Sequence, residues 1–124
     1  MNARSAGAGY EDVALAHLQK AGLALLARNF SCRYGEIDLV MSERDVIVFV
    51  EVRYRRGANV RGGYGDGIDS VGAAKRAKLV RAAEIFLARH VRLAQRTCRF
   101  DVLAIADGEA APAIDWRRNA FDAY

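Results

Sequence analysis

Apolar and polar positions divide the chain into a small set of expected strands and helices. The run Val46–Arg53 is rich in β-branched and aromatic residues, which is typical of a strand buried on both faces. The shorter run Gly35–Val40 alternates polar with apolar residues, as a half-buried strand does. The polar stretch Ser42–Asp45 between them is short, so we predict that the two strands form a hairpin.

Two stretches carry the apolar spacing of an amphipathic helix. The first is Tyr10–Ala21, which Gly22 should terminate as the C′ residue. Its apolar stripe is expected to be Ala14, Leu15, Leu18 and Ala21. The second helix should extend from Asp69 to about Val91, with Asp69 or Ser70 as its N-cap. Its buried stripe is expected to be Leu79, Val80, Ala83, Phe86, Leu87 and Val91.

The remaining apolar segments complete an α/β (α+β) pattern. Leu23–Cys32 is expected to be the first strand, and Arg99–Ala106 a further buried strand. The segment between the third and fourth strands is long enough for a parallel strand–helix–strand crossover. We therefore predict one domain over residues 1–124, with an αβββαβ core and a mixed central sheet.

The two ends of the chain differ in character. Residues 1–8 are small and polar and should be frayed. The tail 107–124 carries apolar Ile114–Trp116 and Asn119–Phe121, and should pack on the core as a short strand or an anchor. The start lacks the apolar core of a signal peptide, and no run approaches the roughly 18 apolar residues of a membrane span. We therefore expect no membrane association and, by default, the cytoplasm.

Positive charge is concentrated in one part of the sequence. From Arg53 to Arg99 there are twelve basic and three acidic residues, a net charge of +9; the remainder has seven basic and twelve acidic residues, a net charge of −5, which gives the overall +4. Nearly all of the positive charge is arginine, which suits bidentate phosphate contacts. The distribution indicates a polyanionic partner, nucleic acid first, with a solvated basic surface as the alternative.

A glycine-rich basic segment, Tyr54–Gly67, follows the third strand. It matches neither the P-loop nor the dinucleotide-binding glycine pattern, so no nucleotide cofactor is expected. Its arginines and aromatic residues fit contact with a nucleic-acid backbone, while a flexible connection is the alternative interpretation. The helix after it presents further lysines. Our candidates for backbone contacts are Arg55, Arg56, Arg61, Lys75 and Lys78.

Three charged residues occupy strands that otherwise look like core: Asp38, Glu51 and Arg53. Glu51 and Arg53 are two residues apart and so lie on one face of their strand. A carboxylate in such surroundings is costly unless something pairs with it. A divalent cation is one such partner. The alternative is a buried ion-pair network in which Arg53 binds both acids.

These residues resemble a known pattern. An acid in the second strand and Glu-x-Arg at the end of the third resemble the motif of the PD-(D/E)XK nuclease superfamily. The similarity to the small bacterial YraN family is closer and extends from about Tyr10 to Phe121. It rests on Glu11, Gly35-Glu36-Ile37-Asp38-Leu39-Val40, Val48-Phe49-Val50-Glu51-Val52-Arg53-Tyr54-Arg55, Lys75, Arg99-Phe100-Asp101-Val102 and Asn119-Ala120-Phe121. YraN-type proteins are similar to archaeal Holliday-junction resolvases. The resemblance implies a restriction-endonuclease-like fold and a metal-dependent endonuclease that binds DNA, including branched DNA.

The resemblance also implies roles for individual residues. Asp38 and Glu51 would bind Mg²⁺ (or Mn²⁺), with the Val52 carbonyl as a further ligand. Glu11 would reach the same cluster from the first helix. Glu36 is expected to lie beyond these ligands. The catalytic set would be Glu11, Asp38, Glu51 and Arg53.

At the last motif position the family pattern has lysine, whereas this chain has Arg53. An arginine is always protonated, so it cannot act as a general base, although it can hold a phosphate. Lys75 is the candidate for the missing amine. A nucleic-acid-binding module that does not cleave is therefore the alternative function. We expect a homodimer, because a DNA junction offers two symmetric strands.

Overall fold

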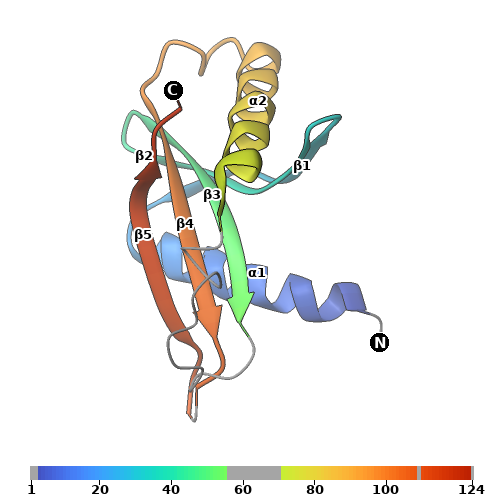
Figure 1. Cartoon of the computed structure of the whole chain (residues 1–124). Helices are drawn as coiled ribbons and strands as arrows, with labels where there is room; N and C mark the ends of the chain where they lie inside the picture. Colours follow the sequence, from blue (N-terminus) through green and yellow to red (C-terminus); the bar gives the residue numbers. More distant parts are fainter. Residues whose placement is uncertain (1–2, 56–70, 109, 124) are drawn as a thin grey trace.

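Five strands form one mixed sheet, and the two helices pack against it (Figure 1). The computed structural model describes residues 3–55, 71–108 and 110–123. The elements in chain order are α1 (Ala3–Lys20), β1 (Ala24–Cys32), β2 (Gly35–Glu43), β3 (Val46–Arg55), α2 (Ala73–Arg89), β4 (Cys98–Ala106) and β5 (Ala113–Phe121). The spatial order of the strands is β1-β2-β3-β4-β5. The strands β3 and β4 are parallel, and the other neighbours are antiparallel. The predicted hairpin, parallel crossover and mixed sheet are confirmed.

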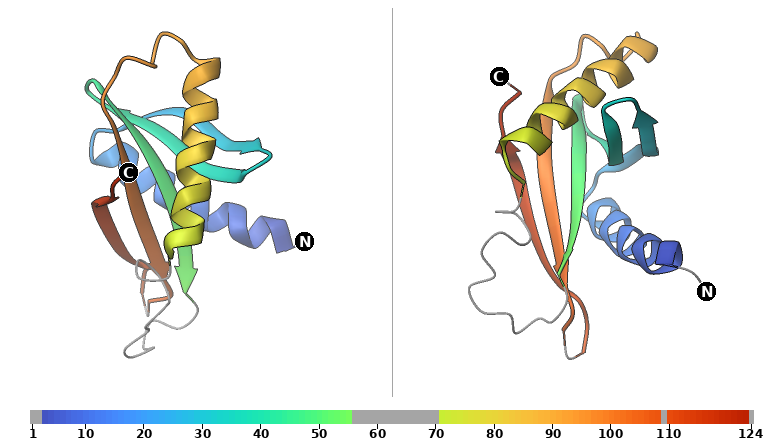
Figure 2. Two further views of the ribbon diagram at one scale, coloured as in Figure 1. Left: turned by 45° about the horizontal axis from the view of Figure 1, so that its top comes forward. Right: turned by 45° about the vertical axis from the view of Figure 1, so that its right-hand side comes forward.

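The two helices lie against different faces of the sheet (Figure 2). Each helix packs on its own apolar cluster. On β3, Ile47 and Phe49 belong to the cluster that contains α2, whereas Val48 and Val50 belong to the cluster that contains α1. Side chains alternate between the faces of a strand, so the apolar run expected of a doubly buried strand supplies both cores. The strand β3 is thereby fixed between two layers.

The helix α1 ends where the sequence predicts. Gly22 has φ of +104°, its N–H donates to Gln19 O, and the Leu23 N–H donates back to Leu18 O, which is a Schellman turn. The start of the helix was predicted wrongly, because α1 begins at Ala3 rather than at about Tyr10. Ala21 lies past the last turn and is exposed, so it does not join the expected stripe.

The helix α2 is shorter than predicted at both ends. Its N-cap is Gly72, which makes no side-chain capping bond, while Asp69 and Ser70 lie outside the described residues. The helix ends at Arg89, and Val91 is 76% exposed, so Val91 was wrongly assigned to the buried stripe. Val91 lies beyond the end of the helix, so the helical spacing that turns the other stripe residues toward the core does not apply to it. Four stripe residues are buried as predicted, namely Leu79, Val80, Ala83 and Phe86, while Leu87 is only half-buried.

Two further differences concern the ends of strands. Tyr54 and Arg55 were placed in the glycine-rich loop, but they extend β3 and pair with Ile105 and Ala106 of β4. The tail forms a full strand, β5, which pairs with β4 as the sheet edge. The parallel neighbour β4 gives the end of β3 a hydrogen-bonding partner that no local pattern reveals. None of the helices in the described part of the chain is long and apolar enough to cross a membrane.

A buried charge network holds β5 in place. The Asp101 carboxylate is fully buried and accepts hydrogen bonds from Arg99 Nε (2.9 Å), Trp116 Nε1 (2.9 Å) and the Asn119 backbone N–H (2.9 Å). Arg99 also donates to Glu43 at 2.7 Å, on β2. Each buried charge here therefore has a partner, which is the condition for tolerating a charge in a core. This cluster is structural.

Candidate active site

The site forms where β2 separates from β3. The β2–β3 pairs run from Glu43↔Val46 to Leu39↔Val50, and beyond them β2 pairs only with β1. At this fork the Asp38 side chain replaces the missing strand partner: its Oδ2 accepts a hydrogen bond from the Val52 N–H at 2.8 Å. Asp38 is thereby held against β3 in a half-buried notch.

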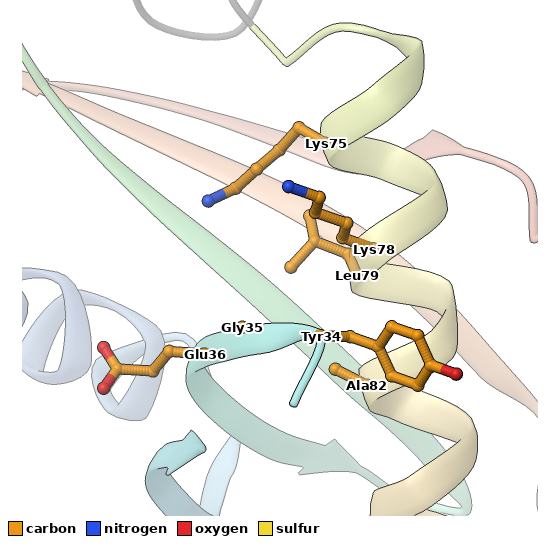
Figure 3. Close-up of a pocket in the computed structure, with 7 residues that line it drawn as sticks. All are labelled: Tyr34, Gly35, Glu36, Lys75, Lys78, Leu79 and Ala82. Atoms are coloured by element: carbon orange, nitrogen blue, oxygen red, sulfur yellow. The ribbon is translucent and has the colours of Figure 1, made fainter. Parts of the chain in front are cut away.

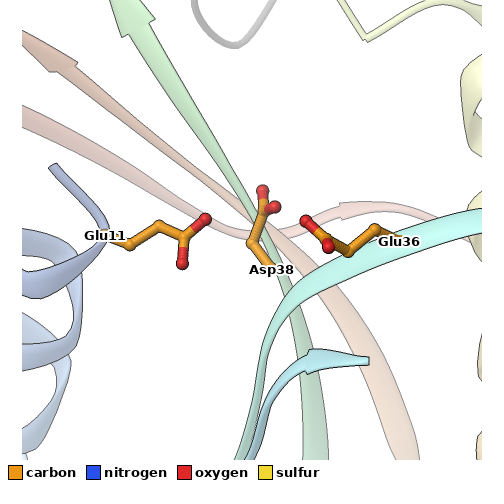
Figure 4. Close-up of side chains that lie close together, drawn as sticks. All are labelled: Glu11, Glu36 and Asp38. Atoms are coloured by element: carbon orange, nitrogen blue, oxygen red, sulfur yellow. The ribbon is translucent and has the colours of Figure 1, made fainter. Parts of the chain in front are cut away.

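Three carboxylates face one another in this notch. One oxygen each of Glu11, Glu36 and Asp38 lies within 4.8 Å of the others. Figure 4 shows the Asp38 carboxylate between those of Glu11, from α1, and Glu36, from the start of β2. The structure brings Glu11 to Asp38 as expected. It also brings Glu36 into this group, although Glu36 was expected to lie beyond the ligands.

Glu51 occupies the side of the site that faces α2. It is 5% exposed, and its Oε2 lies 3.4 Å from an Arg53 guanidinium nitrogen and 3.5 Å from Lys75 Nζ. The sequence did not reveal where Lys75 would lie, since it belongs to a helix that follows a long connection. The packing of α2 on the sheet places this amine beside the motif carboxylate, at the end of β3.

Negative charge is crowded at Asp38. The pKa of its carboxyl is raised from 3.8 to about 7, chiefly by burial and next by the negative charge of Glu51, with smaller contributions from Glu11 and Glu36. The Val52 N–H opposes this shift, because a hydrogen bond to a carboxylate favours its charged form. Burial and the neighbouring negative charges therefore favour the protonated form of Asp38 well above the pH at which an exposed aspartate ionises.

This donor set fits a hard divalent cation. Mg²⁺ and Mn²⁺ prefer oxygen ligands and are commonly held by one or two carboxylates. A cation placed between facing carboxylates would relieve the repulsion that raises the pKa of Asp38. The Arg28 guanidinium already offsets part of the charge, since its Nε lies 3.6 Å from Glu11 Oε1 and its other end donates to Asp12 at 2.6 Å.

The predicted backbone contacts fall into different places. Lys75 and Lys78 both line an open pocket of about 200 Å³ between α2 and the start of β2 (Figure 3). Arg55 is half-buried at the end of β3. Arg56 and Arg61 lie outside the described residues, so their predicted contacts stay predictions.

The structure places a pair of stacked tyrosines next to the site, which the sequence did not reveal. The rings of Tyr10 and Tyr54 stack with centroids 3.9 Å apart, and each hydroxyl donates to the Asp107 carboxylate at 3.0 Å. These contacts raise the pKa of Tyr10, first through its hydrogen bond with Tyr54 and then through burial and Asp107. They join the helix that carries Glu11 to the end of β3. Tyr10 and Asp107 are 97 residues apart, so no local signal could have identified the pair.

Known proteins resemble this chain over most of its length. The model of the "uncharacterised protein family UPF0102" matches residues 10–105. The UPF0102 protein of Pseudomonas paraeruginosa is 47% identical over 98% of this chain and 96% of its own length. Those of Stutzerimonas stutzeri (49% identical, 96% of each chain) and Ectopseudomonas mendocina (50% identical, 94% of each chain) are similar. This is the YraN family indicated by the sequence motifs. The chain belongs to the uncharacterised protein family UPF0102.

Proposed function

We propose that this protein is a nucleic-acid-binding, metal-dependent DNA endonuclease that resembles Holliday-junction resolvases. One observation carries the proposal: Asp38 sits at the β2–β3 fork among three other carboxylates, with its pKa raised to about 7. Surplus negative charge of this kind is costly for folding and is common where a site must hold a cation or move a proton. Glu51 and Glu11 have basic partners, but Asp38 forms no ion pair with any residue that the structure describes, whereas the buried Asp101 is paired with Arg99.

The surroundings of the cluster agree with this proposal. The acidic residues come from α1, β2 and β3, which is the order of the motif residues in the superfamily that the sequence resembles. The mixed sheet with one parallel pair fits a restriction-endonuclease-like fold. The positive residues of α2 border the same notch, and a negatively charged substrate would need them.

Asp38 and Glu51 would hold the metal ion, with the Val52 carbonyl as a further ligand. The carboxylates of Glu11 and Glu36 lie close enough to Asp38 to share in the same ion. When bound, Mg²⁺ or Mn²⁺ would supply an activated water and stabilise negative charge on the phosphodiester. The Val52 N–H keeps the Asp38 carboxylate oriented toward β3. Arg53, always protonated, would hold a non-bridging phosphate oxygen.

Lys75 is the residue that can replace the lysine usual at the motif position. The Lys75 Nζ lies 3.5 Å from Glu51 Oε2, and Arg53 contacts this same oxygen. A protonated Lys75 would orient the attacking water and stabilise the negative charge that develops on the phosphate. Unlike a guanidinium group, a lysine ammonium can also release its proton.

A second candidate function is a nucleic-acid-binding module that does not cleave. Arg53 favours it, since this residue departs from the motif at the position where the family pattern has lysine. The module would keep salt-dependent binding without any metal-dependent product.

Cleavage of a labelled four-way DNA junction separates the two candidates. Duplex and single-stranded controls would be run beside it in Mg²⁺, Mn²⁺ and EDTA. The variants are Glu51→Ala, Lys75→Met and Arg53→Lys, and the matched acid control is Asp115→Asn, whose side chain is 63% exposed on β5.

Metal-dependent cutting by the wild type and Asp115→Asn, lost in Glu51→Ala and Lys75→Met, is the result expected of the nuclease. Cutting by Arg53→Lys alone would identify a binding module inactivated at one position. Binding without cutting by any variant would refute the nuclease and leave the module. Neither binding nor cutting would refute both candidates.

Two further parts of the proposal concern assembly and location. A junction-cleaving enzyme needs two equivalent sites, so the protein would act as a homodimer, which sedimentation at micromolar concentration tests. An enzyme of chromosomal DNA would act in the cytoplasm, which labelling in cells tests.

A further inference from the structure

An open pocket borders the acidic group on its α2 side. It lies between the beginning of α2 and the turn that leads into β2, and its volume is about 200 Å³ (Figure 3). Leu79 and Ala82, both buried, form its apolar part. Glu36 belongs both to this pocket and to the acidic group, so the two sites are continuous.

Two ammonium groups face the pocket. Lys75 is bound to Glu51 at 3.5 Å, whereas Lys78 forms no ion pair or hydrogen bond with any residue that the structure describes. Figure 3 shows both lysine chains extending from α2 toward the same space, while the Glu36 carboxylate points away from them. An unpaired ammonium beside an open pocket favours an anion there.

The positive charge continues outward along the helix. Tyr34 lines the pocket, and two guanidinium groups lie near its ring: the Arg33 carbon is 5.1 Å from the ring centroid and the Arg81 carbon 5.9 Å. Lys75, Lys78 and Arg81 follow one another at three-residue intervals, which is about 4.5 Å along the helix axis per step. An extended row of cations suits a chain of phosphates better than one isolated anion.

We infer that this pocket binds a backbone phosphate of the nucleic-acid strand next to the phosphate at the acidic group. Lys78 holds that phosphate, and Tyr34, flanked by Arg33 and Arg81, contacts the sugar or base beyond it. The strand thus follows α2 inward from Arg81 toward Glu36. The inference rests on the proposed function and assigns the path of the substrate strand and two of its contacts, Lys78 and Tyr34.

Binding in EDTA tests the inference apart from any cleavage. Fluorescence anisotropy with a labelled four-way junction and a labelled duplex would be measured at several salt concentrations. The variants are Lys78→Gln and Lys78→Gln combined with Arg81→Gln. Arg44→Gln is the matched control, since Arg44 is exposed in the β2–β3 turn at the opposite end of β2. Free inorganic phosphate and a mononucleotide serve as competitors.

Losing one phosphate contact should reduce the slope of log affinity against log salt concentration by about 0.9. If variant and wild type bind equally at 1 M salt, the variant then binds about eightfold more weakly than the wild type at 0.1 M salt. We expect this change for Lys78→Gln, a larger one for the double variant and less than twofold for Arg44→Gln. Millimolar phosphate or mononucleotide should compete poorly.

Three outcomes would overturn the inference. Equal affinity and slope for Lys78→Gln and Arg44→Gln would refute the pocket while leaving the proposed function intact, provided that the wild type binds. Tight competition by the mononucleotide alone would assign the pocket to a small ligand. A wild type that binds no nucleic acid would refute the proposed function together with the inference.

Discussion

Replacing Asp38 by asparagine should make the folded protein less sensitive to pH. In the wild type the Asp38 carboxyl is half-buried beside Glu51, Glu11 and Glu36, and these surroundings disfavour its ionised form. An asparagine has nearly the same shape, carries no charge, and keeps an oxygen that can accept the Val52 N–H. The variant therefore removes the repulsion and retains the hydrogen bond.

The pKa values set both the sign and the size of the effect. A carboxyl whose pKa rises on folding binds its proton more tightly in the folded state, so the stability of the wild type falls as pH rises from 3.8 through about 7. With these two values the penalty rises by about 3 kcal/mol between pH 5 and pH 8. Over this pH range, Asp38→Asn should therefore gain about 3 kcal/mol relative to the wild type.

Urea unfolding at pH 5 and pH 8, followed by the fluorescence of the single tryptophan, Trp116, measures this gain. EDTA must be present so that no divalent cation offsets the repulsion. The control Asp115→Asn, on the exposed face of β5, should show the same difference from the wild type at both pH values to within about 0.5 kcal/mol. A difference for Asp38→Asn that stays constant, or falls, between pH 5 and pH 8 would refute the raised pKa of Asp38.

Other substitutions test the contacts that support the site. Asp101→Ala leaves Arg99 with Glu43 as its acidic partner but removes the acceptor of Trp116 Nε1 and of the Asn119 N–H, so it should cost about 3 kcal/mol of unfolding free energy; a loss below about 1 kcal/mol in denaturant titration would show that the network is dispensable. Tyr54→Phe keeps the ring stack but removes one donor to Asp107, so a loss of about 1 kcal/mol is expected in the same titration, and an unchanged midpoint would argue against the bond. Gly22→Ala forces a side chain into φ of +104° and should lower the thermal midpoint, whereas Gly9→Ala, within α1 and with no atom within 4 Å of the added Cβ, should not.

Much of the framework could be predicted because its signals are local. The alternation in Gly35–Val40 and the apolar run Val46–Arg53 depend only on neighbouring residues, and a short polar turn fixes their antiparallel pairing. The positions of Asp38 and Glu51 near one another follow from that pairing. The ends of α2 and β3 were predicted less well, because an exposed helix end and a parallel strand partner are set by distant parts of the chain.

The composition of the site depended on tertiary structure. Glu36 and Asp38 share one face of β2 by strand alternation, but only the packing of α1 on the sheet adds the Glu11 carboxylate to them. The packing of α2 on the sheet brings Lys75 to Glu51. The length of the segment between β3 and α2 does not predict on which side of the site α2 will pack.

The sequence by itself determined the order of the elements, the family and the acids of the motif, because strand alternation, helical spacing and motif residues are written in consecutive positions. Only the tertiary structure decided which cations face those acids, how strongly the carboxylates repel one another and where a pocket opens beside them. Burial and the distances between charges depend on how two helices pack against a forked sheet, and no residue's neighbours in the sequence specify that.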